Sequence, residues 1–340
     1  MDAGKQNAIG NSAAMNTIKK LLNTQSIWLV LIVMVAITGI AAPVFLSRDN
    51  IFNVLMTESI IGILTVGVMW PILSRGIDLS LGAVVALSSV VSASFAQRAD
   101  YATRMFPGLP PMPIIVAVLA GISVGVIFGL INGLLVAYTR IPAFIATLGT
   151  QLIARSMAQL YTNAYPVPTL WNEFKDLGQA WTLGIPNVVW FLILFCVVSG
   201  FLLTQTRFGN NVFAIGGNDQ AARVAGIHVE KNLVKVYTWC AVCAAFGGVL
   251  MAARSGAGNS SYGLNYELDA IAAATVGGTS HYGGICRISG VIAGILILGV
   301  LKNAMLILGI NVYLQQAFKG LIIIAGILIL GVLKNAMLIL

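Results

Sequence analysis

Apolar runs of about twenty residues recur along nearly the whole chain, and this constrains the fold more than any other feature. A run of that length is what an α-helix needs to cross the hydrocarbon core of a bilayer. The expected fold is therefore all-α, a polytopic membrane protein whose transmembrane domain occupies residues 27–340. We assign about ten spans, some of them short or re-entrant: residues 27–46, 52–73, 79–96, 113–138, 143–160, 185–204, 235–253, 268–280, 288–308 and 314–336.

Composition agrees with a membrane protein, because 58% of the 340 residues are hydrophobic and only 9% are charged. Soluble domains carry about 25% charged residues. The formal charge is +8, and an excess of Lys and Arg in cytoplasmic loops accounts for such a charge in a membrane protein. We therefore expect membrane lipid around the chain and no nucleic-acid partner. The same rule predicts a cytoplasmic N-terminal segment (residues 1–26), a cytoplasmic loop at 205–234 and an outer loop at 161–184.

One predicted span carries small residues at every fourth position. In residues 113–138 these are Gly121, Gly125, Gly129 and Gly133. A spacing of four places them on one ridge of a helix, where the lack of side chains lets another helix approach closely. We therefore predict a helix-packing role for these glycines.

Acidic residues stand where two of the spans begin. Asp78 and Ser80 lie in "SRGIDLSLGA", and Glu267 and Asp269 lie in "NYELDAIAAATVGG". One hypothesis is N-capping, in which the carboxylate accepts backbone N–H bonds at a helix start. The other is that broken helices turn these polar ends toward a translocation pathway. The two hypotheses are compatible.

Other charged residues lie inside the spans, namely Glu58, Arg155 and Lys319. Such residues are costly in a bilayer unless they are paired or face water. Gln315, Gln316 and Lys319 share one helical face, which should point into the bundle or lie near its boundary. The sequence alone leaves the pairing partners open.

No catalytic or metal site is expected. His228 and His281 are isolated, and Cys240 and Cys243 lie in an apolar run, which is typical of buried thiols. The nucleotide-binding pattern GxxxxGK[ST] is absent from the sequence, and Ser, His and Asp residues are not clustered in it. We therefore expect a chain that is not an enzyme and binds no cofactor.

The predicted cytoplasmic loop carries the most distinctive pattern. "TRFGNNVFAIGGNDQAARVAGIHVEKNLVKVY" resembles the signature of the permease subunits of monosaccharide ABC importers of the ribose, xylose and galactose/methyl-galactoside type. Three further blocks agree in the same order: "GIDLSLGAVVAL" (76–87), "IPAFIATLGT" (141–150) and "YELDAIAAATVGGTS" (266–280). The resemblance covers roughly residues 27–323.

This resemblance implies a permease in the bacterial inner membrane, with its N-terminus in the cytoplasm. It implies a homodimer of permeases, a partner ATPase subunit that holds ATP and Mg²⁺, and a periplasmic or lipid-anchored sugar-binding protein. Within the loop, a short helix with two central alanines would dock on the ATPase, with Asn218 able to cap its start. The residues implied in coupling are Gly217, Asn218, Ala221, Ala222, Arg223 and Gly226.

Two questions stay open at this point. The first is the sugar, which is of the galactose/methyl-galactoside or the ribose class. The second is the mechanism, since an ion-coupled secondary sugar transporter is the alternative to an ABC importer, and in it Glu58 or Asp78 would have to serve as the ion site.

A literal repeat marks the end of the sequence. "IAGILILGVLKNAMLIL" stands at residues 292–308 and again at 324–340. Copies within a repeat family diverge in sequence and keep their spacing. Identity at every position therefore favours a recent duplication or an assembly error, and we interpret 324–340 as the duplicated copy.

Overall fold

Helices make up nearly all the regular structure of the computed structural model, which describes residues 27–110 and 112–338. A helix lies within each predicted span, so the prediction of an all-α polytopic membrane protein is confirmed. The predicted segment 1–26 lies outside the described residues. In chain order the elements are a helix at Ile27–Ala41, η1 (Pro43–Leu46), α2 (Arg48–Leu73), α3 (Leu81–Phe95), α4 (Ile114–Tyr138), α5 (Ala143–Thr162), α6 (Asn172–Gln179), β1 (Trp181–Thr182), β2 (Ile185–Pro186), α7 (Asn187–Gln205), α8 (Arg207–Gly217), α9 (Asp219–Val224), α10 (Val229–Ser255), α11 (Tyr266–Val276), α12 (Ile288–Ile307) and α13 (Val312–Leu338).

The helices differ in whether they can cross a membrane by themselves. Among the described residues, five helices are long and apolar enough to do so: α2, α4, α7, α10 and α12. The helix Ile27–Ala41 and α3 are apolar but shorter. The segment that we expected to be the shortest span is α11, which has 11 residues. A helix that short cannot reach across the hydrocarbon core.

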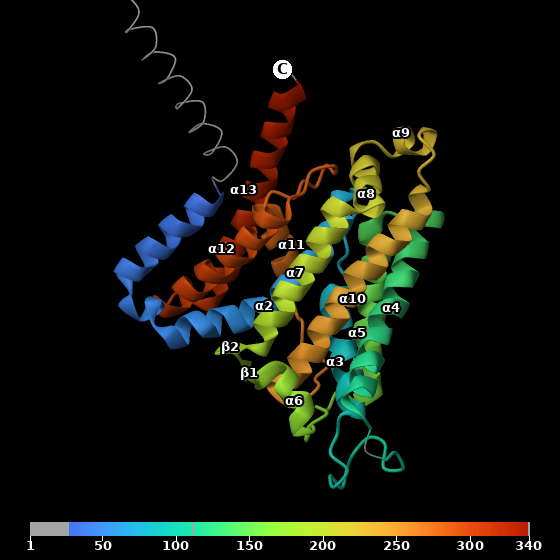
Figure 1. Cartoon of the computed structure of the whole chain (residues 1–340), viewed down its shortest axis with the longest axis vertical. Helices are drawn as coiled ribbons and strands as arrows, with labels where there is room; N and C mark the ends of the chain where they lie inside the picture. The colour runs from blue at the N-terminus through green and yellow to red at the C-terminus, as the bar shows by residue number, and fades with distance from the viewer. Residues whose placement is uncertain (1–26, 111, 339–340) are drawn as a thin grey trace, which may run out of the picture.

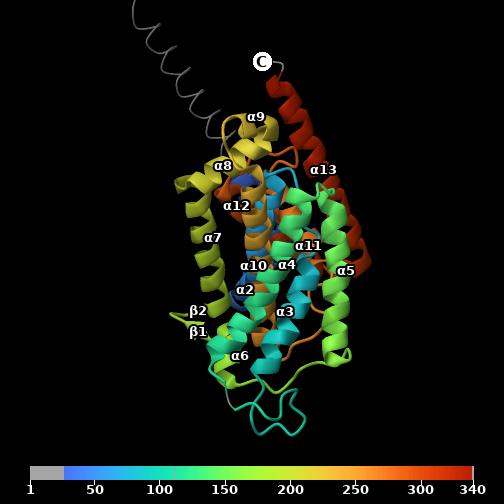
Figure 2. The same cartoon turned by 90° about the vertical axis from the view of Figure 1, so that its right-hand side faces the viewer.

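Helix α10 occupies the middle of the bundle, where it packs against α2, α3 and α4. Figure 2 shows α7 and α5 on opposite sides of this group, with α13 along the outside. The largest fully buried side chains include Trp70 of α2 and Tyr237 of α10. Helices α8 and α9 lie at one end of the bundle, and α6 with the antiparallel pair β1–β2 lies at the other (Figure 1).

The small residues of α4 face α10, as their spacing indicates. Gly121, Gly125, Gly129 and Gly133 are all buried. A Cβ atom at Gly129 would lie 2.6 Å from Cα of Thr238, and one at Gly133 would lie 2.7 Å from Cα of Val234. Because these neighbours are backbone atoms, the two helices could not stay this close if the ridge carried side chains.

Helices α2 and α3 are separated by a non-helical segment, residues 74–80. Pro71 lies in the last turn of α2, and Arg75 has φ 64°, in the left-handed region that ends helices. Asp78 and Ser80 of this segment are fully buried. Irregular backbone at membrane depth is tolerated where protein surrounds it and satisfies its polar groups. The end of the α2–α3 break, with Asp78 and Ser80, therefore lies in the interior of the bundle.

Candidate functional site

The α8–α9 loop (residues 205–234) folds into two short helices with capped starts. Thr206 Oγ1 accepts a hydrogen bond of 3.3 Å from the N–H of Gly209 at the start of α8. Asn218 Oδ1 accepts one of 3.0 Å from the N–H of Ala221 at the start of α9. Capping of this kind stabilises a helix end by about 1 kcal/mol. Asn218 therefore occupies the capping position that its side chain favours.

The two central alanines of α9 have different environments. Ala221 is exposed, whereas Ala222 is 3% exposed and packs with Ile215 and Val229 inside the loop's own small core. Ala222 is therefore not part of the exposed surface of α9. A larger side chain at position 222 would therefore disrupt the packing against Ile215 and Val229 before it affected any partner. The exposed apolar side chain of α9 is Val224, which is 91% exposed.

The remaining residues implied in coupling lie at the two ends of α9. Gly217 precedes it, and a Cβ added there would meet nothing within 4 Å. Gly226 follows it with φ 82°, a conformation that side-chain-bearing residues rarely adopt. Arg223 forms an ion pair with Glu230, which ties α9 to the first turn of α10.

Arg75 joins three segments that are far apart in the sequence. Its Nε donates to the carbonyl of Gly216 at 2.7 Å and to that of Tyr282 at 3.0 Å, and its Nη2 donates to the carbonyl of Gly217. The N–H of Gly284 donates to the carbonyl of Leu73 at 3.0 Å. The end of α2, the end of α8 and the turn between α11 and α12 therefore share one set of hydrogen bonds.

A buried chain of polar side chains connects the α2–α3 break to α4 and α5. Thr150 Oγ1 donates to Asn132 Oδ1 at 2.6 Å, and Asn132 Nδ2 donates to Ser80 Oγ at 2.9 Å. Ser80 Oγ in turn donates to Asp78 Oδ1 at 2.6 Å. The chain ends on Asp78, whose Oδ1 accepts from Ser80, whereas its buried Oδ2 has no hydrogen-bond partner among the described residues.

The capping hypothesis for the acidic residues fits only in part. The N-cap residue of α3 is Ser80, and Asp78 accepts the N–H of Ser80 at 2.9 Å. Asp78 therefore fixes the position of Ser80, which precedes α3, and does not cap the N–H groups of α3 itself. Glu267 and Asp269 lie in the first turn of α11, and their side chains reach other helices.

Four charged side chains from four helices meet in one intramembrane cluster. Lys302 Nζ of α12 lies 3.3 Å from Glu58 Oε1 of α2 and 3.3 Å from Asp269 Oδ2 of α11. Lys319 of α13 pairs with Asp269 Oδ1. Two ammonium groups face two carboxylates, so the cluster is neutral as a whole. This arrangement answers the question that the sequence left open, namely how charges inside the spans are compensated.

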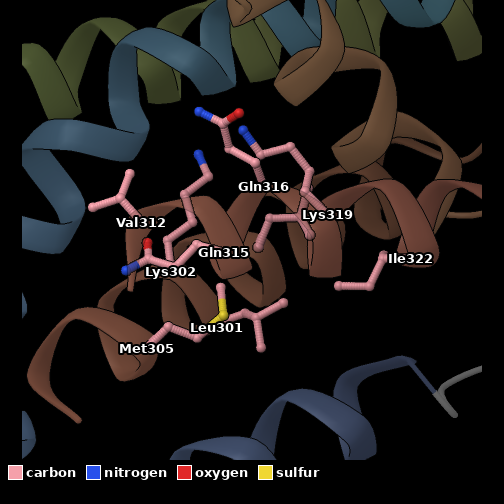
Figure 3. A pocket seen from close by; sticks show the side chains of 9 residues that line it. Leu301, Lys302, Met305, Val312, Gln315, Gln316, Lys319 and Ile322 are labelled. Carbon is pink, nitrogen blue, oxygen red and sulfur yellow. The ribbon is translucent and has the colours of Figure 1, made fainter. Parts of the chain in front are cut away.

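A pocket of about 150 Å³ lies beside this cluster, between α12 and α13. Figure 3 shows the side chains of Lys302 and Lys319 pointing to the same side, with the amide of Gln316 beside them. Gln315 also lines the pocket, so the polar face predicted for α13 faces the bundle. The remaining lining is Leu298, Leu301, Met305, Val312 and Ile322.

Helices α5 and α11 share a second polar contact. Gln151 Nε2 donates to Glu267 Oε1 at 3.3 Å. Arg155 Nη1 donates to the carbonyls of Ser260 at 2.6 Å and Tyr262 at 2.7 Å, in the turn that leads to α11. Arg155 is therefore satisfied by backbone carbonyls, a kind of partner that no sequence pattern reveals.

The His and Cys side chains of the described residues do not build a metal site. Among residues 27–110 and 112–338, no three His, Cys, Asp or Glu side chains stand together in a way that could hold a metal ion. Cys240 and Cys243 are buried free thiols. His281 Nε2 lies 2.7 Å from Thr275 Oγ1.

Comparison with known proteins identifies the family. The family model described as "Branched-chain amino acid transport system / permease component" matches residues 50–327. The galactose/methyl galactoside import permease protein MglC of Escherichia coli K12 is 38% identical over 309 residues, covering 89% of this chain and 92% of that protein. The ribose import permease protein RbsC of the same strain is also 38% identical, covering 90% and 92%. RbsC of Bacillus subtilis 168 is 36% identical, covering 86% and 88%.

None of the solved structures matches the chain significantly. The relatives nevertheless match across nearly the full length of both partners, and the family model spans the α8–α9 loop and helices α4, α7, α10 and α12. This extent sets aside the alternative of an ion-coupled secondary transporter. The chain belongs to the family of ABC importer permeases that includes the MglC and RbsC proteins.

Proposed function

We propose that this permease imports a monosaccharide of the galactose or ribose class across the bacterial inner membrane, as a homodimer driven by a partner ATPase subunit. The observation that carries the proposal is the near-complete match to two curated sugar permeases. The identity to each is 38%, so the two relatives support both sugar classes equally. A separate sugar-binding protein would deliver the sugar from the outer side, and the ATPase would hold ATP and Mg²⁺.

Uptake into proteoliposomes that hold the permease, its ATPase and its binding protein tests this function. We expect ATP-dependent accumulation of galactose or ribose that persists when the proton gradient is dissipated. Leucine is the control substrate, because the description of the matching family model names branched-chain amino acid transport. Accumulation of leucine and of neither sugar would overturn the proposed substrate class.

We propose that the α8–α9 loop is the coupling element, with α9 docking on the ATPase. The exposed side chains of Ala221 and Val224 form its apolar contact surface. Gly217, Asn218 and Gly226 shape the ends of α9, and Arg223 ties it to α10. Ala222 acts from inside the loop, where it supports the surface without touching the partner.

Replacing Val224 by aspartate should therefore weaken ATPase binding and leave the permease folded. A buried apolar anchor at an interface is worth about 2 kcal/mol, which corresponds to about thirtyfold in affinity. Co-purification of the ATPase with the variant measures the loss. Leu183→Asp is the matched control, because Leu183 is 88% exposed at the opposite end of the bundle. Equal ATPase retention by the two variants would argue against α9 as the docking helix.

We propose that the N-terminus and the α8–α9 loop face the cytoplasm, since the basic residues are concentrated on that side. In a variant without native cysteines, Ala221→Cys should react with an impermeant thiol reagent only after the cells are opened. Leu183→Cys should react in intact cells. The reverse pattern would mean that the chain is inserted in the opposite orientation.

We propose that Asp78, Ser80, Glu267 and Asp269 position the helices that surround the translocation pathway. All four are buried, and their partners lie on neighbouring helices and on the α2–α3 break. Asp78 and Ser80 order the α2–α3 break, whereas Glu267 and Asp269 fix α11 to α5, α12 and α13.

We propose that residues 324–340 are the duplicated copy and that 292–308 is the original. In the first copy, Lys302 pairs with Glu58 and Asp269, and Asn303 exchanges hydrogen bonds of 2.9 Å with Asn50. The family match ends at residue 327, just after the second copy begins. Replacing 324–340 by a plain apolar helix with a basic end should leave sugar uptake unchanged. Loss of uptake at unchanged expression would assign a role to the second copy.

A further inference from the structure

A cavity of about 520 Å³ lies between α9 and the ends of α2, α4 and α10. Figure 1 shows α9 beyond the ends of α4 and α10, so the cavity lies on the membrane side of α9. One wall is apolar and comes from the last turn of α4 and the first turns of α10. The lining consists of Ser74, Arg75, Val136, Ala137, Arg140, Ile215, Asp219, Gln220, Arg223, Val229 and Leu233.

Three arginines and a single carboxylate, that of Asp219, line this cavity. Arg75 donates to backbone carbonyls, and Arg223 pairs with Glu230. Arg140 donates no hydrogen bond to any described residue, although it interacts electrostatically with Glu230. Counting Glu230 as well, the arginines still exceed the carboxylates, so the cavity has a net positive charge that the chain does not neutralise.

The position of Arg140 places this charge at the membrane surface. Arg140 follows the end of α4 and has φ 58°, where glycine would be the favoured residue. Tyr138, in the last turn of α4, is 58% exposed. An exposed aromatic residue beside a basic one is typical of the level of lipid headgroups.

We propose that this cavity binds the headgroup phosphate of an anionic phospholipid from the cytoplasmic leaflet, with Arg140 and Arg223 as its ligands. Guanidinium groups bind phosphate oxygens through paired hydrogen bonds. Basic pockets between membrane helices on the cytoplasmic side are suited to such headgroups. The inference rests on the proposed orientation, and it places a lipid directly against the proposed coupling helix α9.

An acidic side chain of the ATPase is the other anion to consider. The cavity is walled by α4 and α10, and α9 stands between it and a partner that docks on the exposed face of α9. A lipid headgroup reaches the cavity from the membrane surface, where Arg140 and Tyr138 are exposed. The geometry therefore favours the lipid.

Native mass spectrometry of the purified full-length permease tests the proposal, with phosphatidylglycerol, phosphatidylcholine and inorganic phosphate as separate probes. We expect preferential binding of phosphatidylglycerol. Each arginine near the surface contributes about fivefold to the affinity for an anionic lipid, so R140Q/R223Q should bind it about 25-fold more weakly. R140K/R223K keeps the charge but loses the paired hydrogen bonds, so its binding should lie between that of the unmodified chain and that of R140Q/R223Q. These measurements need neither sugar nor ATPase, so they are independent of the proposed transport function.

R98Q/R104Q is the matched control, because it also removes two arginines, one of them ion-paired as Arg223 is. It should bind phosphatidylglycerol as the unmodified chain does. Unchanged binding by R140Q/R223Q, or an equal loss in the control, would overturn the assignment. Binding of inorganic phosphate with no lipid preference would replace the lipid by a free anion. Loss of the ATPase from R140Q/R223Q with lipid binding intact would give the cavity to an acidic side chain of the partner.

Discussion

Replacing Lys302 by methionine should lower the free energy of unfolding by about 3–5 kcal/mol, the loss that follows when one partner of a buried ion pair is removed. Lys302 is the only partner that the described residues offer to Glu58 at ion-pair distance. Without it, the Glu58 carboxylate stays in the membrane interior with no counter-charge, while Asp269 keeps Lys319. Thermal unfolding of the purified permease in detergent measures the effect.

A second substitution should reverse most of this loss. Glu58→Gln combined with Lys302→Met leaves one carboxylate and one ammonium group, those of Asp269 and Lys319. Arg98→Met is the control for the loss of a positive charge, because Arg98 and Asp100 form an exposed ion pair that contributes little to stability. If the double variant is as unstable as the single one, charge balance does not explain the cluster.

The second large effect should come from Gly129→Ala on the ridge of α4. The added methyl group would lie 2.6 Å from Cα of Thr238, so α4 and α10 must separate. Overpacking of this kind costs about 1–3 kcal/mol, and the backbone position of the neighbour favours the upper end. The midpoint of thermal unfolding and the elution profile of the purified permease report the change.

Gly149→Ala on α5 provides the comparison for the ridge. A Cβ at Gly149 would meet nothing within 4 Å, so the change should stabilise the helix by roughly 0.5–1 kcal/mol through backbone entropy alone. Equal behaviour of the two glycine variants would show that the ridge does not set the distance between α4 and α10.

The sequence predicts best those features that depend on residues close together in the chain. Apolar runs locate the membrane helices because hydrocarbon requires satisfied backbone groups along its whole depth. The four-residue spacing of glycines marks the face of α4 that meets α10. The preference of Asn for a helix start identifies the cap of α9. Each of these features depends on residues within a few turns of one another.

Features made by distant segments were not predictable. Glu58, Asp269 and Lys319 carry no local sign of their partners, since the cluster forms only after four helices have packed. The burial of Ala222 depends on Ile215 and Val229 on either side of α9. The eight-residue helix α6, in the predicted outer loop, was also missed, because helices this short depend on tertiary contacts more than on propensity.

The charge cluster also has a consequence for synthesis of the chain. Glu58 precedes Lys302 by 244 residues, so α2 enters the bilayer long before its counter-charge has been made. A charged residue near the middle of an inserting helix costs about 3 kcal/mol on biological insertion scales. Until α12 and α13 emerge from the ribosome, α2 and α11 carry uncompensated carboxylates in the membrane. A chain that stops before Lys302 therefore keeps the carboxylates of Glu58 and Asp269 in the membrane without the counter-charges of Lys302 and Lys319.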